Sequence, residues 1–239
     1  MQVTTKAIVL SSIKYGDSSL IVKAFTEAAG LQSYLLKGVL SSRKSKMKAA
    51  YFQPLTQLEI VASHKGKGNL EHISEVRVNY HYRSIYSDMA KNAIAIFLAE
   101  ILLKSIGEEE ENAGLFQFLE ASFQWLDTHD QISNFHLYFM IRLCMFLGIY
   151  PDTSHSDYLY FDLQDGRFVN TPGLNPLLKG NMLFQFRKLL GINFDAIHRV
   201  KMTKKERQEL LQNLVMYFEL HLHGFQKPRS LAILNEVFN

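Results

Sequence analysis

The chain has 239 residues, of which 47% are hydrophobic and 21% are charged, and its formal net charge is +3. This composition is typical of a folded protein and excludes a disordered one, and the length allows one large domain or two smaller ones. A single cysteine, Cys144, excludes an internal disulfide and any metal site built from several cysteines. The longest apolar run, 93–103, is shorter than the ~20 residues that a membrane-spanning helix needs. With no signal segment at the N-terminus, we expect a cytoplasmic, monomeric protein that does not enter a membrane.

The charge is unevenly distributed. Residues 1–83 contain twelve Lys or Arg against five Asp or Glu, a net charge of +7. The remaining residues contain 14 basic and 18 acidic side chains, a net charge of −4. Such asymmetry is typical of a nucleic-acid-binding part joined to a different part. We therefore expect the first part to contact nucleic acid and the second to dock other proteins.

The first 80 residues show the pattern of a small β domain. Short runs rich in Val, Ile, Leu, Thr and aromatic residues alternate with turn residues such as Gly16, Asp17 and Gly30. The expected strands are 5–10, 19–26, 31–37, 55–62 and 69–78. Five short strands in this length predict the five-stranded Greek-key β-barrel of the oligonucleotide/oligosaccharide-binding (OB) fold. The segment 7–10 is apolar on both faces, so we expect the barrel core on one side of it and a covering element on the other.

After Tyr80 the apolar residues recur with helical spacing. The expected helices are 85–103, 113–126, 132–147, 176–190, 203–222 and 230–238. Asp165-Gly166 predicts a β-hairpin within 158–170, and Thr203 with Glu206 forms the pattern of a capping box. The predicted fold class is therefore α+β, with an OB domain at 1–80 and an α-helical domain at 81–239 that carries the hairpin as an insertion.

A cationic run is the first candidate binding site. No acidic residue occurs between Glu27 and Glu59, and five positive charges fall within twelve residues. They are Lys37, Arg43, Lys44, Lys46 and Lys48. Because clustered like charges repel one another unless an anion lies against them, the run predicts contact with a nucleic-acid backbone. The same run would also fit a solvated surface loop.

Further candidates lie in two turns of the basic half. Lys14 and Tyr15 precede Gly16, and Tyr15 is the best candidate for stacking on a base, because most other aromatic residues in this half fit the core. Lys65 and Lys67 stand in a Lys-Gly-Lys-Gly hairpin tip, where they either contact phosphates or keep the turn soluble. We include all four among the expected nucleic-acid contacts.

Arg142 is the single charge on the otherwise apolar helix 132–147. It can pack its stem in the core while its guanidinium finds a carboxylate. Alternatively, the guanidinium lines a groove that receives the acidic tail of a partner protein.

Sequence motifs of catalysis are missing. The chain has no Gly-x-Ser-x-Gly elbow and no His-Glu-x-x-His pair, and the adjacent Ser154-His155-Ser156-Asp157 cannot form a triad, whose members converge from separate parts of a fold. We therefore expect no enzyme, no cofactor and no metal. The alternatives are a single-strand RNA-binding OB protein, and a hydrolase or transferase with an unrecognised site in the helical domain.

Several short motifs, taken in order, resemble those of the bacterial DNA-repair family RecO. They include 7–10, Tyr15-Gly16-Asp17, 20–22 with Phe25-Thr26, Gly30-Leu31, Lys37-Gly38 with its basic loop, Pro54-Leu55, 146–151 and 228–231. The resemblance covers essentially the whole chain. It implies a recombination mediator of the RecF pathway that binds single- and double-stranded DNA, anneals complementary strands and contacts the C-terminal tail of single-strand-binding protein. With RecR, such a mediator helps to load RecA, which would place this protein at the nucleoid. The resemblance also implies DNA contacts at the cationic run.

The chain departs from this family at one place. Many members carry a four-cysteine zinc site after the helix that ends in Leu-Gly-x-x-Pro, whereas 152–173 contains no cysteine here. We expect the Asp-Gly hairpin to order this segment in place of the metal.

Overall fold

The computed structural model describes residues 2–41, 47–64, 70–107 and 111–238. The chain divides into two compact units, Met1–Thr128 and His129–Asn239. We expected a junction near residue 80, where the last strand of the first unit ends. The two helices that follow this strand belong to the same compact unit as the sheet. The two units are described separately below.

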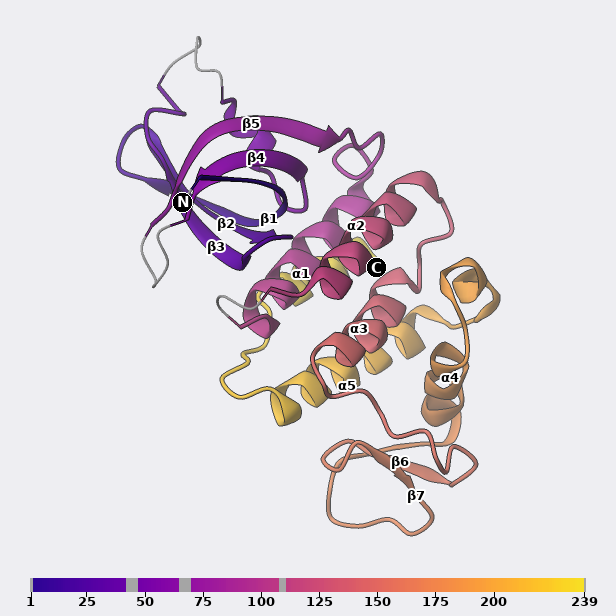
Figure 1. Cartoon of the computed structure of the whole chain (residues 1–239). Helices are drawn as coiled ribbons and strands as arrows, with labels where there is room; N and C mark the ends of the chain where they lie inside the picture. The colour runs from indigo at the N-terminus through magenta and orange to yellow at the C-terminus, as the bar shows by residue number, and fades with distance from the viewer. Residues whose placement is uncertain (1, 42–46, 65–69, 108–110, 239) are drawn as a thin grey trace. The chain divides into compact units, whose positions relative to one another are not determined.

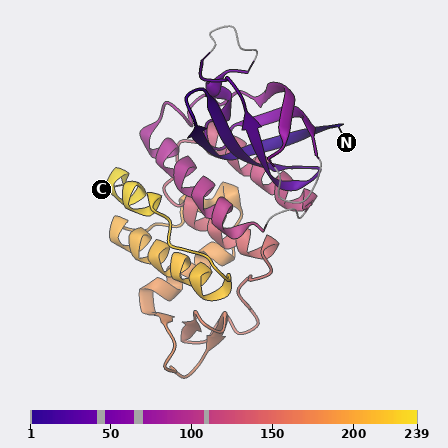
Figure 2. The same ribbon diagram turned by 90° about the vertical axis from the view of Figure 1, so that its left-hand side faces the viewer.

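The first unit contains a five-stranded antiparallel sheet with the order β3-β2-β1-β4-β5 (Figure 1). Its strands are β1 (Gln2–Tyr15), β2 (Ser19–Thr26), β3 (Gly30–Leu36), β4 (Gln57–Ser63) and β5 (His72–Tyr80). The prediction of five strands is confirmed, but β1 continues five residues beyond its expected end at Leu10. β1 pairs with β4 along residues 2–8 and with β2 along residues 7–15, and the β1–β2 register shifts between Val9 and Ser11. Such a bulge increases strand twist, and the strands curl strongly in Figures 1 and 2.

The edge strands β3 and β5 are joined at one point. Tyr34 and Glu71, the residue before β5, form an isolated parallel bridge. Leu35 N donates to Glu71 O at 2.9 Å, and Glu71 N donates to Ser33 O at 2.8 Å. Among the described residues no continuous ladder connects these two strands, so the fold observed is a curled five-stranded antiparallel sheet, in which closure into the expected barrel is not seen.

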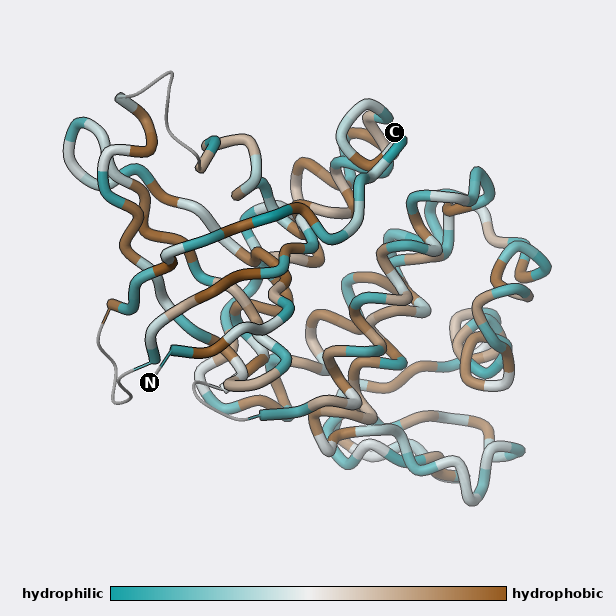
Figure 3. The backbone as a smooth tube through the Cα atoms, turned by 45° about the horizontal axis from the view of Figure 1, so that its top comes forward, coloured by the Kyte–Doolittle hydropathy of each residue, from teal (hydrophilic) through white to brown (hydrophobic). Residues whose placement is uncertain are grey.

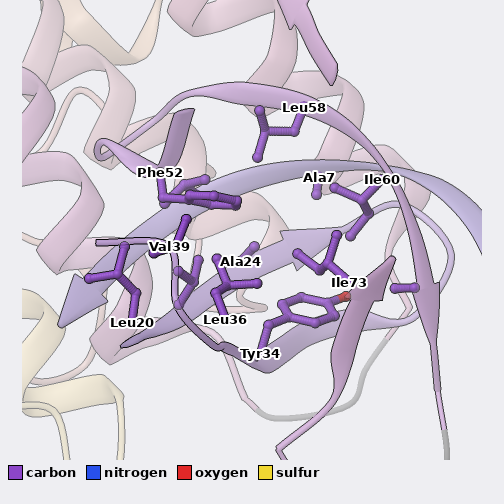
Figure 4. Packing of buried hydrophobic residues seen from close by; sticks show 13 residues of the cluster. Ala7, Leu20, Ala24, Tyr34, Leu36, Val39, Phe52, Leu58, Ile60 and Ile73 are labelled. Carbon is purple, nitrogen blue, oxygen red and sulfur yellow. The ribbon is translucent and has the colours of Figure 1, made fainter. Parts of the chain in front are cut away.

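One face of this sheet encloses the core of the unit. Buried and partly exposed positions alternate along most of β2 and β4, as expected for strands with one buried face. Figure 3 shows hydrophobic stretches along the strands of this sheet. The buried cluster contains Ala7, Val9, Leu20, Val22, Ala24, Tyr34, Leu36, Val39, Phe52, Leu58, Ile60, Ala62 and Ile73. Phe52 ends the short 3-10 helix η1 (Ala49–Phe52) and lies beside Val39 and Leu20 in Figure 4. The segment that follows the cationic run is thereby anchored in the core.

Two helices complete the first unit, α1 (Met89–Ser105) and α2 (Ala113–Thr128). Helix α1 packs on β1, and Phe25, the partner of Ile8 in the sheet, stacks on Phe116 of α2 with ring centroids 6.2 Å apart. The apolar segment at 7–10 is therefore buried on both faces, which confirms the expectation of a covering element.

The second unit is mostly helical. It contains α3 (Phe135–Phe146), α4 (Gly180–Leu190), the 3-10 helix η2 (Phe194–Arg199), α5 (Lys204–His221) and α6 (Ser230–Val237). Helix α3 is buried along most of its length and packs on α4, α5 and η2, as its apolar sequence predicts. Thr203 and Glu206 form the predicted capping box at the start of α5. In the described part of the chain, no helix is both long and apolar enough to cross a bilayer.

A three-stranded sheet is inserted between α3 and α4, with the order β7-β6-β8. The predicted hairpin is confirmed by β6 (Tyr160–Asp162) and β7 (Arg167–Val169). The third strand, β8 (Leu177–Lys179), was expected to be the first turn of a helix. It pairs with β6 instead, and the helix begins at Gly180, whose φ of +56° marks the change of direction.

Candidate nucleic-acid interface

The chain brings three of the expected contact residues to one end of the β1–β2–β3 part of the sheet. Lys14 pairs with Leu20 of β2, and Leu20 pairs with Leu36 of β3, which directly precedes Lys37. Because neighbouring strands lie ~4.8 Å apart, the backbones at Lys14 and Lys37 are separated by roughly 10 Å. Both lysines and Tyr15 are exposed.

Tyr15 and Lys37 share a face of the sheet. Tyr15 pairs with Ser19, and one further step along the β2–β3 register places Lys37 opposite the same serine. The adjacent row on this face is Ile13, Ile21 and Leu35. Ile13 is 63% exposed and Tyr15 is 56% exposed. The sheet end therefore combines a cation with apolar and aromatic groups that are open to solvent, which is the combination that binds single-stranded nucleic acid.

The beginning of the cationic run is fixed against the β1–β2 turn. Leu40 N donates to Ser18 O at 2.9 Å, and Val39 is buried in the core cluster. Lys48, at the other end of the run, is exposed and accepts a backbone hydrogen bond from Tyr51 at 3.0 Å. Phe52 anchors this second end in the same cluster. The described ends of the run are thus held by the core that lies beneath the sheet end.

Five expected contacts lie outside the described residues: Arg43, Lys44, Lys46, Lys65 and Lys67. His64 is the last described residue before the turn that contains Lys65 and Lys67. It directly follows β4, whose last residue, Ser63, pairs with Gln2. Gln2 and Lys14 stand near opposite ends of β1. The residue that leads into the Lys65 and Lys67 turn is therefore not at the sheet end that carries Lys14 and Lys37.

Other cations of the basic half are neutralised within the first unit. Lys6 Nζ lies 3.0 Å from Glu120 Oε1, and Arg77 Nη2 lies 2.7 Å from Glu59 Oε2. The hydrogen bond that each cation donates to its carboxylate raises the pKa of Lys6 and of Arg77. These side chains attach elements of the unit to one another, so the positive charge of residues 1–83 is not all directed to a ligand.

Arg142 is half-buried on α3. It lies near enough to Tyr138 to favour ionisation of that phenol, although burial has the larger effect and raises the Tyr138 pKa. No described carboxylate forms an ion pair with Arg142. The expectation that its guanidinium finds an internal carboxylate therefore receives no support from the described residues.

The apolar row formed by Ile13, Ile21 and Leu35 was not expected from the sequence. The pattern predicted a first strand that ends at Leu10, ahead of the turn residues Tyr15-Gly16-Asp17. The signal that was available is the alternation of Ile13 and Tyr15, which gives two large side chains on one face of a strand. Among the described residues, no group of three His, Cys, Asp or Glu side chains is placed to hold a metal ion.

Comparison with known proteins agrees with the predicted resemblance. The family model "Recombination protein O N terminal" matches residues 1–82, and "Recombination protein O C terminal" matches residues 86–231. The chain is 46% identical over 238 residues to the DNA repair protein RecO of Christiangramia forsetii, with all of both chains covered. It is 46% identical over 239 residues to that of Flavobacterium psychrophilum, again over the full length of both chains. It is 34% identical over 250 residues to that of Porphyromonas gingivalis, and all of both chains are covered.

These matches span both compact units, and the relatives are named for DNA repair and not for a catalysed reaction. With one cysteine in its sequence, the chain cannot form a four-cysteine site. The chain belongs to the RecO family of DNA repair and recombination proteins, whose members are mediators and not enzymes.

Proposed function

We propose that this protein is a DNA-binding recombination mediator that holds single- and double-stranded DNA on the β1–β3 end of its sheet and anneals complementary strands. The observation that carries the proposal is the convergence of Lys14, Tyr15 and Lys37 on that end, next to the described ends of the cationic run. Phosphate contacts by the lysines supply affinity through counterion release, and Tyr15 supplies a surface on which any base can stack.

The proposal includes an OB architecture for the sheet. In support of it, β1 contains a register shift after Val9 and is shared by two partner strands, β4 along residues 2–8 and β2 along residues 7–15. The parallel bridge between Tyr34 and Glu71 brings the edge strands together, as closure of a small barrel requires. In an OB fold, oligonucleotides bind on the strand 2–3 face, on which the Ile13–Ile21–Leu35 row lies.

The wider role follows from the family. We propose that the protein contacts the acidic tail of single-strand-binding protein, with Arg142 as a candidate contact, and acts with RecR to load RecA on coated DNA. Arg142 is a half-buried cation, and it has no ion-pair partner among the described residues. Its guanidinium is therefore available to an acidic tail, which supports its proposed role. The proposed place of action is the cytoplasm, at the nucleoid, and the proposed solution state is a monomer.

A salt-dependent titration tests the proposed DNA site. The variant K14A/K37A/K48A removes three exposed cations from the sheet end and the ends of the run. The matched control R77A/R83A/K104A removes three cations from elsewhere in the same unit. We expect the first variant to bind single-stranded DNA more weakly and to reduce the slope of log affinity against log salt by about 2, at ~0.7 per lost phosphate contact. Equal slopes in the two variants would remove the sheet end from the site.

Two further arms complete the experiment. R43A/K44A/K46A should weaken binding in the same way if the rest of the cationic run lies along the same strand. Matched DNA and RNA oligonucleotides should bind with similar affinity or with a preference for DNA, because the proposed contacts are to phosphates and base faces. A clear preference for RNA would instead favour a single-strand RNA-binding protein.

A further inference from the structure

A second cationic segment lies in the helical unit. Residues 198–207 contain five Lys or Arg side chains and a single acidic residue, Glu206. The four consecutive glutamates at 108–111 are equal in number to the whole excess of acidic over basic residues after residue 83, and they precede this unit. The unit His129–Asn239 consequently contains twelve Lys or Arg and ten Asp or Glu, a net charge of +2. The helical unit is therefore not acidic overall, although residues 84–239 taken together have a net charge of −4.

The backbone of this segment is held in place by side chains from three helices or their ends. The side-chain amide of Asn134 donates to Ile197 O at 3.2 Å and to Val200 O at 2.7 Å. The side-chain amide of Gln185 donates to Lys201 O at 3.1 Å. Asn134 and Gln185 are each only 5% exposed. These contacts fix the position from which the lysine side chains extend, unlike the backbone of a free lysine-rich loop.

Arg207 adds a further contact to the same segment. Its Nη1 donates to Met202 O at 2.7 Å, so four carbonyls between residues 197 and 202 each accept a side-chain hydrogen bond. Glu206 is occupied in the capping box, where Oε2 accepts from Thr203 N. The acidic residue of the segment is therefore used in starting α5 and does not pair with the cations around it.

A hollow of about 330 Å³ opens beside the segment. Its lining includes Asp130, Ser133, Asn134, His198, Lys201 and Arg207. Lys201, Lys205 and Arg199 are exposed, and no cation of residues 198–207 forms an ion pair within the described part of the chain. The hollow thus presents a surface for a phosphate-bearing ligand.

The size of a second recess favours a phosphate backbone over an acidic peptide as the ligand of this segment. It is lined by Lys204, Arg207 and the apolar side chains Leu211, Leu234 and Phe238. Its volume is only about 10 Å³, so it is filled by the protein's own side chains and cannot take the apolar residue of a peptide. The cationic segment offers fixed charge without an apolar socket, which suits a sugar-phosphate chain better than an acidic tail with apolar anchors.

We propose that the cationic segment 198–207 and its hollow bind the sugar-phosphate backbone of a second nucleic-acid strand. This inference rests on the proposed function, in which the sheet end binds the first strand. Annealing requires two mutually repelling strands to be held by one protein, and a second cationic surface in the other unit allows each strand to be bound separately.

The test compares K201A/K204A/K205A with the matched control K179A/K188A/K227A in the full-length protein. The control removes the same charge from the same unit but outside the segment. Arg207 is kept, because it holds the backbone. The readouts are the number of non-complementary single strands bound per protein at saturation, the salt dependence of the weaker binding step, and the rate of annealing of complementary strands.

We expect the K201A/K204A/K205A variant to bind its first strand with unchanged affinity. Its stoichiometry should fall from two strands to one, the salt slope of the weaker step should fall by about 2, and annealing should slow at least tenfold. Circular dichroism melting should give the same midpoint for the variant and the control. The control should keep two strands and normal annealing.

Three results would overturn the inference. The first is a K201A/K204A/K205A variant that matches the control in stoichiometry and annealing, while K14A/K37A/K48A still loses first-strand binding; the proposed function would then stand. The second is an acidic peptide that binds the unaltered protein, is lost in the K201A/K204A/K205A variant and is not displaced by DNA. The third is an unaltered protein that binds no nucleic acid, in which case the proposed function fails as well.

Discussion

Lys6 in β1 donates to both carboxylate oxygens of Glu120 in α2, at 3.0 and 3.3 Å. The same glutamate accepts from Gln57 through its backbone carbonyl at 3.0 Å, and Asn79 Nδ2 lies 3.4 Å from its Oε1. One helical residue therefore contacts side chains from β1, β4 and β5. This network attaches α2 to the sheet, and it uses a lysine that composition alone would assign to the nucleic-acid surface.

We predict that Lys6→Ala leaves DNA affinity and its salt slope unchanged and lowers the free energy of unfolding by about 0.5 kcal/mol, because the pair is partly solvated. The hydrogen bond to Glu120 raises the pKa of Lys6. The stabilisation is therefore fully present below the unfolded-state pKa of about 10.4 and is lost as the pH rises above it. Urea titrations at pH 7 and pH 11 measure the difference. A loss of DNA binding in this variant would place Lys6 in the site.

Tyr15 gives a second prediction, since it is the exposed aromatic side chain on the proposed DNA-binding face. Stacking of a base on an aromatic ring contributes about 1–3 kcal/mol. Tyr15→Ala should therefore weaken single-strand binding by roughly 5- to 150-fold, whereas Tyr15→Phe should retain most of the affinity. The salt slope should stay the same in both variants, because no phosphate contact is removed. Fluorescence anisotropy with a labelled oligonucleotide measures both quantities.

Sequence patterns predicted the existence of most elements, and the reasons for the errors are physical. Helix α3 and the capping box of α5 were predictable, because apolar spacing and a local hydrogen-bonding motif determine them. The end of β1 and the strand β8 were not, because residues 11–15 and Leu177–Lys179 become strands by pairing with β2 and with β6, and their own composition does not predict this. Tertiary contacts override local propensity at both places.

The candidate site was also predicted only in part. Charge counting identified the cationic run but could not separate Lys6 and Arg77, which form ion pairs within the unit, from Lys14 and Lys37. That separation depends on the contact of α2 with Lys6, on the β4–β5 register that places Arg77 opposite Glu59, and on the register of β1, β2 and β3. The segment 198–207 was hidden because the four glutamates at 108–111 were averaged with it in a single net charge.

The zinc content of the protein is a third prediction. The segment 152–173, which contains no cysteine, is ordered by other contacts: Asp162 Oδ1 accepts from Gln164 N at 2.9 Å and Asp165 N at 3.0 Å, and Asn175 donates to the same carboxylate. Metal analysis of the purified protein should find less than 0.1 equivalent of zinc, about a tenth of a full site, and a chelator should leave the thermal midpoint unchanged. A full equivalent of zinc would refute this account of residues 152–173.

The last prediction concerns acid stability. His136 on α3 is 3% exposed, and its Nδ1 has no hydrogen-bond partner among the described residues. Burial, together with the charge of Arg207, lowers the pKa of His136 to about 3. Its unfolded-state pKa is about 6.5, so the unfolded chain binds a proton that the folded chain excludes between these values.

A folded-state pKa below the unfolded-state value means that stability is fully present above pH 6.5 and is lost as the pH falls. At pH 5 the loss from this residue should be about 2 kcal/mol relative to pH 7.5. His136→Gln should lower stability at pH 7.5 but remove this part of the pH dependence. His155→Gln, at an exposed ring stacked on Tyr158, is the control and should keep it. Urea denaturation of the three proteins at both pH values measures the difference, and an unchanged pH dependence in His136→Gln would show that His136 is protonated in the folded protein.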